Sequence, residues 1–338
     1  MTDDTTQPCL LADVGGTNVR FALARPTMPE PLQMDSIYAY RVADFPTMSD
    51  AARAYLDVVG AKPGNAVFAV AGPVRGTQAQ LTNHSWAISA PQLQAALGLA
   101  SVRLVNDFAA VGMSLPLLRT QDVKALGHAV HGIVRGTGSQ TFCVLGPGTG
   151  LGVSALVIRD GRVFGLETEG GHGSFAPTSE EEIGVLRQLI ARFGRVSNER
   201  LLCGSGLVNV YHALCAMAGT TALGLPPEEI TARALNQADP QCVRAAALFC
   251  DMLGAVAGDL ALVYGAWDGV YLAGGVLTAL APLLESERFR MRFNDKGRFA
   301  DAMARVPVGL ITHAQPGLLG AAGFALAAAG QPLLRDRA

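Results

Sequence analysis

The chain has 338 residues, of which 50% are hydrophobic and 16% are charged. This length and composition favour two folded domains and argue against a largely disordered protein. The formal net charge of −2 and the scattered arginines argue against a surface that mainly binds nucleic acid.

The cysteines and the apolar segments indicate the compartment. None of the six cysteines forms a C-x-x-C or C-x-C pair, so we expect free thiols in a reducing environment and no structural zinc. The first nine residues, MTDDTTQPC, lack the basic and apolar parts of a secretory signal. Residues 317–330 are apolar but too short and glycine-rich to span a membrane, and they predict a buried helix. We therefore expect a cytoplasmic protein with neither membrane nor nucleic-acid partners.

The first third of the chain predicts paired strands, followed by strands that alternate with helices. Two strands are expected around a glycine turn in residues 10–23, and residues 25–36, which hold three prolines, predict a loop. Further strands are predicted at 66–71 and 102–105, and helices at 50–59 and 90–99. This order indicates an α/β fold with a layered sheet.

The rest of the chain repeats the strand–turn–strand pattern and then becomes mostly helical. Residues 126–141 predict a loop or a domain boundary, and a second glycine turn follows within residues 141–158. Apolar spacing predicts helices and one further strand at 180–193, 206–217, 242–263 and 269–272.

Two glycine-threonine turns of the same design lie about 130 residues apart. The first is Gly15-Gly16-Thr17 in CLLADVGGTNVRFAL, and the second contains Gly148 and Thr149 in TFCVLGPGTGLGVSALVI. Glycines let successive backbone N–H groups converge on a phosphate oxygen, and threonine adds a hydroxyl donor. Two such hairpins facing each other would hold a polyphosphate from both sides, which predicts a phosphoryl-transfer enzyme. Each turn alone is also compatible with an ordinary hairpin.

Asp13, just before the first turn, is a candidate for holding Mg²⁺ through water, because Mg²⁺ keeps part of its hydration shell. The turn is not a Walker P-loop, since the lysine of that motif is missing. A third glycine turn, Gly274-Gly275, ends a predicted strand, where a base or ribose could approach the backbone. A simple strand-to-helix turn fits it equally well.

Asp107 directly follows the predicted strand 102–105, with Asn106 beside it. Ligands of open α/β sheets bind at the carboxyl ends of strands. A carboxylate about 3 Å from a hydroxyl group can orient it and accept its proton. The alternative is that Asp107 caps a helix beginning at Phe108.

Glu169 and His172 flank two glycines, and Glu199 lies in the segment VSNER. A carboxylate accepts hydrogen bonds, and a neutral imidazole both donates and accepts, so Glu169 and His172 suit a polyol. Metal binding and a polar loop without function remain alternatives for that pair. Spacing alone favours a capping role for Glu199.

Taken in order, nine segments resemble the bacterial glucokinase family, which belongs to the sugar kinase/actin/Hsp70-like ATPase superfamily. They cover nearly the whole chain and read ADVGGTNVRFAL, AVAGPVRG, LTNHSW, VNDFAAVGMSL, GPGTGLGVSAL, EGGHGSFAP, VSNERLLCGSGLVNVY, LAGGV and HAQPGLLGAAGFAL. The cysteine-rich zinc motif of the related repressor and kinase branch is missing, and Ala12 stands where relatives often have glycine.

The resemblance implies a two-domain ribonuclease H-like fold, also called the actin-like ATPase fold, with the active-site cleft between the domains. The implied small domain comprises residues 9–117 and 316–338, and the large domain residues 118–315. The implied activity is transfer of the γ-phosphate of ATP to the 6-hydroxyl of D-glucose, with Mg²⁺ as cofactor. A homodimer is the family expectation.

The resemblance also implies a role for each motif. Asp107 would be the catalytic base, and the sugar would be bound by Asn106, Asp107, Glu169, His172 and Glu199. The nucleotide would be bound by Ala12, Asp13, Val14, Gly15, Gly16 and Thr17, by Gly148 and Thr149, and, at the adenosine, by Gly274 and Gly275.

Three alternatives remain on sequence alone. The acceptor could be fructose, mannose or an N-acetylhexosamine, because epimers differ by few hydrogen bonds. A sugar-sensing regulator would need a DNA-binding module, and about ten residues before the first strand cannot form a helix-turn-helix. An ATPase or actin-like assembly protein fits less well with the sugar-type pair Glu169 and His172. Asn83, His84 and Trp86 either border the sugar site or serve in packing.

Overall fold

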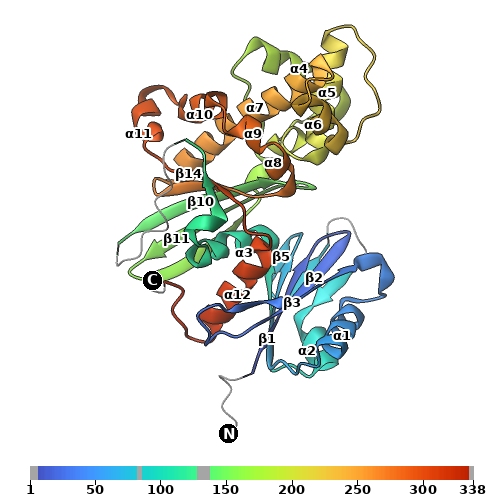
Figure 1. Cartoon of the computed structure of the whole chain (residues 1–338), viewed down its shortest axis with the longest axis vertical. Helices are drawn as coiled ribbons and strands as arrows, with labels where there is room; N and C mark the ends of the chain where they lie inside the picture. The colour runs from blue at the N-terminus through green and yellow to red at the C-terminus, as the bar shows by residue number, and fades with distance from the viewer. Residues whose placement is uncertain (1–6, 82–85, 128–137, 335–338) are drawn as a thin grey trace.

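A computed structural model describes residues 7–81, 86–127 and 138–334. Two β-sheets lie one above the other in the elongated molecule, with two helices between them and further helices on their outer faces (Figure 1). The predicted α/β architecture is confirmed.

The first sheet has five strands in the order β3-β2-β1-β4-β8. Their bounds are β1 (Cys9–Val14), β2 (Asn18–Ala24), β3 (Leu32–Arg41), β4 (Asn65–Val70) and β8 (Ser101–Asn106). Strands β1, β4 and β8 run parallel, and the hairpin β1–β2 and the pair β2–β3 are antiparallel. The parallel strands therefore all end at the same edge, where Asn106 and the first glycine turn lie.

One face of this sheet is covered by α1 (Met48–Val59) and α2 (Ala90–Leu97), whose apolar residues join its core. Thr47 caps α1 by accepting a hydrogen bond from the Asp50 N–H. A small three-stranded sheet, β5 (Val74–Arg75), β6 (Gln78–Gln80) and β7 (Ala87–Ser89), follows β4 in the chain.

The second sheet has six strands in the order β12-β11-β10-β13-β14-β9. Their bounds are β9 (Val123–Ala125), β10 (Gln140–Pro147), β11 (Leu151–Arg159), β12 (Arg162–Thr168), β13 (Gly269–Leu272) and β14 (Val308–Ile311). The hairpin β10–β11 is antiparallel, and β10, β13 and β14 run parallel. Both sheets thus repeat one design, a glycine hairpin followed by parallel strands.

Helices cover the outer face of the second sheet (Figure 1). They are α4 (Glu180–Phe193), α5 (Gly204–Met217), α6 (Pro227–Leu235), α7 (Pro240–Tyr264), α8 (Gly275–Ala279), α9 (Ala281–Leu284), α10 (Glu287–Asn294) and α11 (Ala300–Ala304). Among the described residues, α7 alone has the length and hydropathy of a membrane span, and 78% of its apolar window is buried inside the protein. That burial is typical of a core helix.

Helices α3 (Asp107–Ser114) and α12 (Pro316–Ala328) form the layer between the two sheets (Figure 1). Their apolar residues share one core with Leu11 of the first sheet and with Phe142 and Val144 of the second. The two helices approach closely at Gly320, where a Cβ would lie 1.5 Å from the Ala110 carbonyl oxygen. Because α3 continues directly from β8, this layer connects the end of the first sheet to the second.

Short 3-10 turns complete the chain at η1 (Val42–Asp44), η2 (Leu115–Leu117), η3 (Thr120–Asp122), η4 (Gly170–His172), η5 (Asn198–Arg200) and η6 (Gly297–Phe299). All six cysteines are buried free thiols, as predicted for their apolar surroundings.

The predicted loop at 25–36 is wrong in its second half, because β3 begins at Leu32. The three prolines lie before that residue, and β3 pairs with β2 through Ala24 and Leu32. The Leu23 N–H also donates to the Ser36 hydroxyl, which ties the two strands together. The domain boundaries at residues 117 and 316 remain predictions.

Candidate active site

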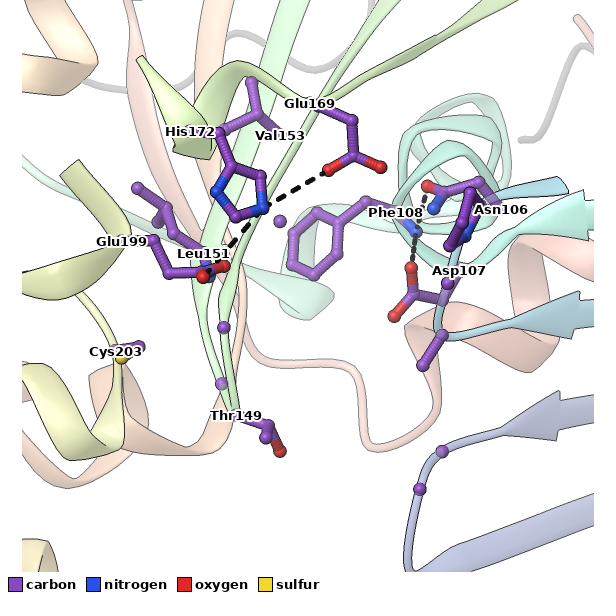
Figure 2. A pocket seen from close by; sticks show the side chains of 18 of the residues that line it. Asn106, Asp107, Phe108, Thr149, Leu151, Val153, Glu169, His172, Glu199 and Cys203 are labelled. Carbon is purple, nitrogen blue, oxygen red and sulfur yellow. Dashed lines mark hydrogen bonds and ion pairs between the residues drawn. The ribbon is translucent and has the colours of Figure 1, made fainter. Parts of the chain in front are cut away.

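A cavity of about 870 Å³ is lined by strand ends and turns of both sheets. Asn106 and Asp107 border it on one side, and Glu169, His172 and Glu199 border it on the other (Figure 2). Both glycine turns contribute to its wall through Gly15, Gly16 and Thr17 and through Gly148 and Thr149. Residues from five distant segments thus converge on one space.

Asn106 and Asp107 lie at the junction of β8 and α3. The Asn106 side-chain oxygen accepts hydrogen bonds from the backbone N–H groups of Phe108, at 2.9 Å, and Ala109, at 3.1 Å. Asn106 is therefore the residue that caps α3, and the interpretation of Asp107 as the cap is wrong. One Asp107 oxygen accepts from the Phe108 N–H at 2.9 Å, which orients the carboxylate (Figure 2).

The surroundings of Asp107 raise its pKa to about 7. Burial is the largest cause, and the negative charges of Asp13 and Glu169 act in the same direction. The hydrogen bond from the Phe108 N–H opposes them. A carboxylate with a pKa near neutrality is well suited to accept a proton from a hydroxyl group.

His172 lies between two carboxylates on the opposite wall (Figure 2). Its Nε2 atom is 3.9 Å from Glu169 Oε2 and 3.9 Å from Glu199 Oε1. The Arg195 guanidinium donates a hydrogen bond to the His172 carbonyl oxygen at 2.6 Å, which helps to fix the backbone of the η4 turn. In the described part of the chain, no three His, Cys, Asp or Glu side chains are grouped as a metal site would require.

Glu199 connects this cluster to the second glycine hairpin. Its Oε2 atom accepts a hydrogen bond from the Leu151 N–H at 3.0 Å. At Gly150 a Cβ would lie 2.4 Å from the same oxygen, so the contact requires a glycine there. The carboxylate bonds to the hairpin rather than to its own helical turn, and the capping role suggested by spacing is therefore wrong.

The two hairpin tips are closed by short backbone hydrogen bonds. The Gly15 N–H donates to the Asn18 carbonyl at 2.9 Å, and the Gly148 N–H donates to the Gly150 carbonyl at 2.8 Å. The second tip is also attached to α5, because the Gly204 N–H donates to the Gly148 carbonyl at 3.0 Å.

Five of the predicted nucleotide-binding residues do not line the cavity. Ala12 and Val14 are buried in β1. Asp13 belongs to the same strand, and its Oδ2 atom lies 3.9 Å from Arg20 Nη1. Burial raises the pKa of Asp13, and Arg20 opposes that change. Gly274 and Gly275 lie at the β13–α8 turn, where a Cβ on Gly274 would be 2.4 Å from the Pro147 carbonyl oxygen. These two glycines are thus next to the second hairpin.

The cavity wall also contains residues that the sequence motifs did not indicate, among them Arg20, Phe108, Thr168, Cys203 and Ser205. Two of these residues had a signal in the sequence. Arg20 is a charged residue in the apolar strand after the first glycine turn, and Phe108 is an aromatic residue directly after Asn106 and Asp107.

Trp86 is buried, and its indole N–H donates to the Phe45 carbonyl at 3.2 Å, as expected of a packing residue. Asn83 and His84 lie outside the described residues.

The chain is similar to known proteins over nearly its whole length. The family model described as Glucokinase matches residues 10–328. A glucokinase of Stenotrophomonas maltophilia strain R551-3 is 50% identical over 321 residues, which cover 95% of this chain and 96% of that protein.

Two solved structures are also similar. A glucokinase from an Antarctic psychrotroph has a TM-score of 0.83 and 34% identity, with 94% of this chain and 98% of that chain covered. A glucokinase from Balamuthia mandrillaris, in complex with glucose, has a TM-score of 0.81 and 21% identity, with 95% and 94% covered, and this likeness concerns the fold alone. The predicted actin-like ATPase fold is thereby confirmed, and the chain belongs to the glucokinase family.

Proposed function

We propose that this protein transfers the γ-phosphoryl group of ATP to the 6-hydroxyl of D-glucose. The observation that carries the proposal is the position of Asp107, whose pKa is about 7. It faces a cavity bordered by two glycine hairpins and by a group of sugar-type side chains. Family membership supports the same reaction.

In this proposal the sugar lies between the two walls of the cavity. Asn106, Glu169, His172 and Glu199 bind its hydroxyl groups, since their side chains together offer both donors and acceptors. The sugar is neutral, so the pairing of an imidazole with two carboxylates suits it better than it would suit an anionic substrate.

Asp107 then acts as the base. Its free carboxylate oxygen orients the 6-hydroxyl toward the γ-phosphorus and accepts the proton as transfer proceeds. The cleft lies between a small domain, residues 9–117 and 316–338, and a large domain, residues 118–315. When the cleft closes it excludes water, which limits hydrolysis of ATP.

The hairpin tips hold the phosphates through backbone N–H groups, with Thr17 and Thr149 as hydroxyl donors. Gly274 and Gly275 lie toward the adenosine, and Ala12 and Val14 hold the first turn in register as part of β1. Asp13 fits a Mg²⁺ ion held through water, because such sites need only one or two carboxylates beside the phosphates. Bound Mg²⁺ neutralises charge that develops on the phosphates.

A homodimer in the cytoplasm is the expected form of the enzyme. No zinc is expected to take part, since none of the six cysteines forms a C-x-x-C or C-x-C pair.

The test is a coupled assay of ADP formation with glucose, fructose, mannose and N-acetylglucosamine as acceptors. We expect the largest kcat/KM with glucose and negligible ADP formation without sugar. A higher kcat/KM for another hexose would replace glucose as the acceptor. ADP formation that does not depend on sugar would identify an ATPase instead.

A further inference from the structure

Phe108 directly follows the base, and its ring lies against the second hairpin between the two walls of the cavity (Figure 2). The ring contacts Gly146 and Gly152, which are paired across strands β10 and β11. A Cβ on Gly152 would lie 1.8 Å from a ring carbon, and one on Gly146 would lie 2.8 Å from another. The two glycines therefore form a notch that accommodates the ring only because neither has a side chain.

A second contact holds the backbone of Phe108 to the same hairpin. The Ser154 hydroxyl of β11 donates to the Phe108 carbonyl oxygen at 2.8 Å. Side chain and main chain of one residue are thus both attached to β10–β11. The tip of that hairpin carries Gly148 and Thr149, and the residue before Phe108 is Asp107.

We propose that Phe108 is a positioning residue, whose ring in the notch of Gly146 and Gly152 sets the base against the second phosphate hairpin. This inference rests on the proposed function. Asp107 belongs to the end of the first sheet, and the hairpin belongs to the second, so contacts between Phe108 and the hairpin restrain the position of one relative to the other.

The physical reason is alignment. In-line phosphoryl transfer requires the hydroxyl, its base and the phosphorus to be held close to their reactive geometry. A displacement of about 1 Å can lower the rate about 100-fold without removing any binding group. A shorter side chain at position 108 removes none of the groups proposed to bind sugar and nucleotide. The expected effect is therefore on kcat rather than on either KM.

The experiment uses the full-length protein with the variants Phe108→Leu, Phe108→Ala, Gly152→Ala and the double variant Phe108→Ala/Gly152→Ala. We expect Phe108→Ala and Gly152→Ala each to lower kcat about 10- to 100-fold, with the KM for glucose and for ATP changed less than about threefold. Phe108→Leu keeps part of the ring volume and should retain more kcat than Phe108→Ala.

The double variant tests the contact itself. With no ring at position 108, a methyl group introduced at position 152 has room, so Gly152→Ala should cost less than about threefold in the Phe108→Ala background. Gly165→Ala in β12 is the matched control, because its Cβ would lie at ordinary distances, 3.7 to 3.9 Å, from the neighbouring Phe324, Ala109 and Met113. Its kinetics should be unchanged.

Three results would overturn the inference. The first is unchanged kcat in Phe108→Leu and Phe108→Ala, and the second is additive losses in the double variant. The third is a raised glucose KM with normal kcat, which would make the ring a surface for the sugar. Thermal unfolding of each variant separates lost folding from lost alignment, and Phe108→Leu serves if the larger changes prevent folding. Wild-type protein inactive on glucose and ATP would instead reject the proposed function.

Discussion

The two glycine hairpins share a sequence pattern, but their surroundings differ. Next to the first, at β1–β2, lie two charged side chains, Asp13 and Arg20, 3.9 Å apart. The second, at β10–β11, is contacted by three other segments at its tip and at the residues beside the tip. Those contacts come from Gly204, Glu199 and Phe108.

This difference indicates a division of labour between the hairpins. A turn flanked by a carboxylate and a guanidinium is suited to handling the charge of phosphates and their cation. A turn fixed to the sugar-side acid and to the residue after the base is suited to setting positions. Local sequence produces similar turns, whereas long-range contacts make their surroundings differ.

Asp107 lines the cavity together with both hairpin tips, and replacing its carboxylate should have the largest effect on kcat. We expect Asp107→Asn to lower kcat by about 10²- to 10⁴-fold, because the hydroxyl proton loses its acceptor. The KM for ATP should change little, since both hairpins keep their contacts. In the wild-type enzyme kcat should also fall below about pH 7, where Asp107 becomes protonated.

The measurement is steady-state kinetics of both proteins between pH 5.5 and pH 8.5, a range of about 1.5 units on either side of that pKa. The residual activity of Asp107→Asn should lose this acid limb. Near-normal turnover in the variant would exclude Asp107 as the base between the two hairpins.

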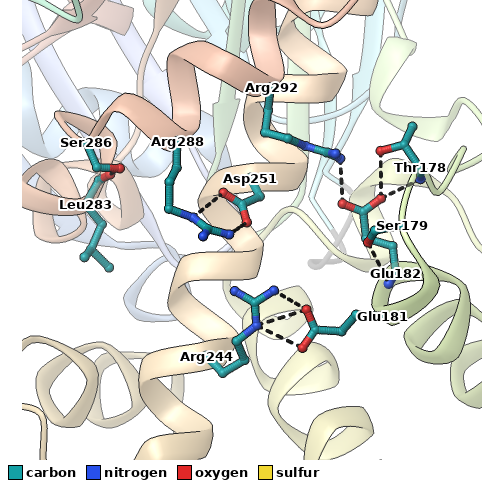
Figure 3. Close-up of polar contacts among 10 residues, drawn as sticks. All are labelled: Thr178, Ser179, Glu181, Glu182, Arg244, Asp251, Leu283, Ser286, Arg288 and Arg292. Atoms are coloured by element: carbon teal, nitrogen blue, oxygen red, sulfur yellow. Dashed lines mark hydrogen bonds and ion pairs between the residues drawn. The ribbon is translucent and has the colours of Figure 1, made fainter.

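An ion-pair cluster of residues that do not line the cavity provides a contrast, because its loss should affect stability and not kinetics (Figure 3). The Glu182 side chain is 2% exposed and accepts hydrogen bonds from Arg292, at 2.6 Å, and from the Thr178 N–H, also at 2.6 Å. We expect Arg292→Met to lower the free energy of unfolding by about 2–4 kcal/mol, since a buried carboxylate loses its charged partner.

The matched control is Arg233→Met, which removes a largely exposed pair with Glu229 and should cost much less stability than Arg292→Met. Denaturant unfolding measures both changes. Folded Arg292→Met protein should show wild-type KM values for glucose and ATP. A raised ATP KM would show that the hairpins depend on remote packing, which would contradict the assignment of their roles to their immediate neighbours.

The acids on the sugar side allow the second hairpin to be tested separately. Glu199 bonds to the Leu151 N–H, whereas the contact of Glu169 within the site is with His172. Both Glu199→Gln and Glu169→Gln should raise the glucose KM about 10-fold or more, because a charged acceptor becomes neutral. Glu199→Gln should also raise the ATP KM about 3- to 10-fold, because the hairpin loses a charge-assisted hydrogen bond.

Initial-rate measurements with each substrate varied in turn distinguish the two variants. Equal ATP KM values in Glu199→Gln, Glu169→Gln and wild type would show that Glu199 serves the sugar alone.

Much of this arrangement can be predicted from the sequence, for physical reasons that differ among the elements. The glycine hairpins follow from apolar runs interrupted by Gly-Thr turns, a pattern that local backbone preferences decide. Asn106 and Asp107 are predictable at the end of a strand because ligands bind there in α/β sheets.

The remaining features depend on contacts that a linear pattern does not contain. The bond from Leu151 to Glu199 and the seat of Phe108 in its glycine notch join segments that meet only after both sheets have formed. The sequence does not distinguish Asn106 from Asp107 as the cap of α3, because both side chains can accept from the first N–H groups of a helix. The start of strand β3 is not predicted, because its pairing with β2, and not its local sequence, makes these residues a strand.

The last predicted effect concerns stability. It tests whether folding places the Asp107 carboxylate in surroundings that disfavour its charged form. The pKa of Asp107 rises from 3.8 to about 7 on folding, so the folded state binds this proton more tightly than the unfolded state does. Its contribution to stability therefore becomes less favourable as pH rises from about 4 to about 7, and then stays constant. The Asp107→Asn protein has no titrating group at this position, so its stability should rise relative to wild type by about 2–3 kcal/mol between pH 5 and pH 8.

Urea unfolding of both proteins at these two pH values measures the gain. Groups remote from Asp107 titrate alike in the two proteins, so the difference between their unfolding free energies reports this carboxylate and its coupling to Asp13 and Glu169. An Asp107→Asn difference that is the same at both pH values would mean that its surroundings do not shift the pKa. The pKa of Asp107, the proposed base, would then keep its ordinary value in the folded protein.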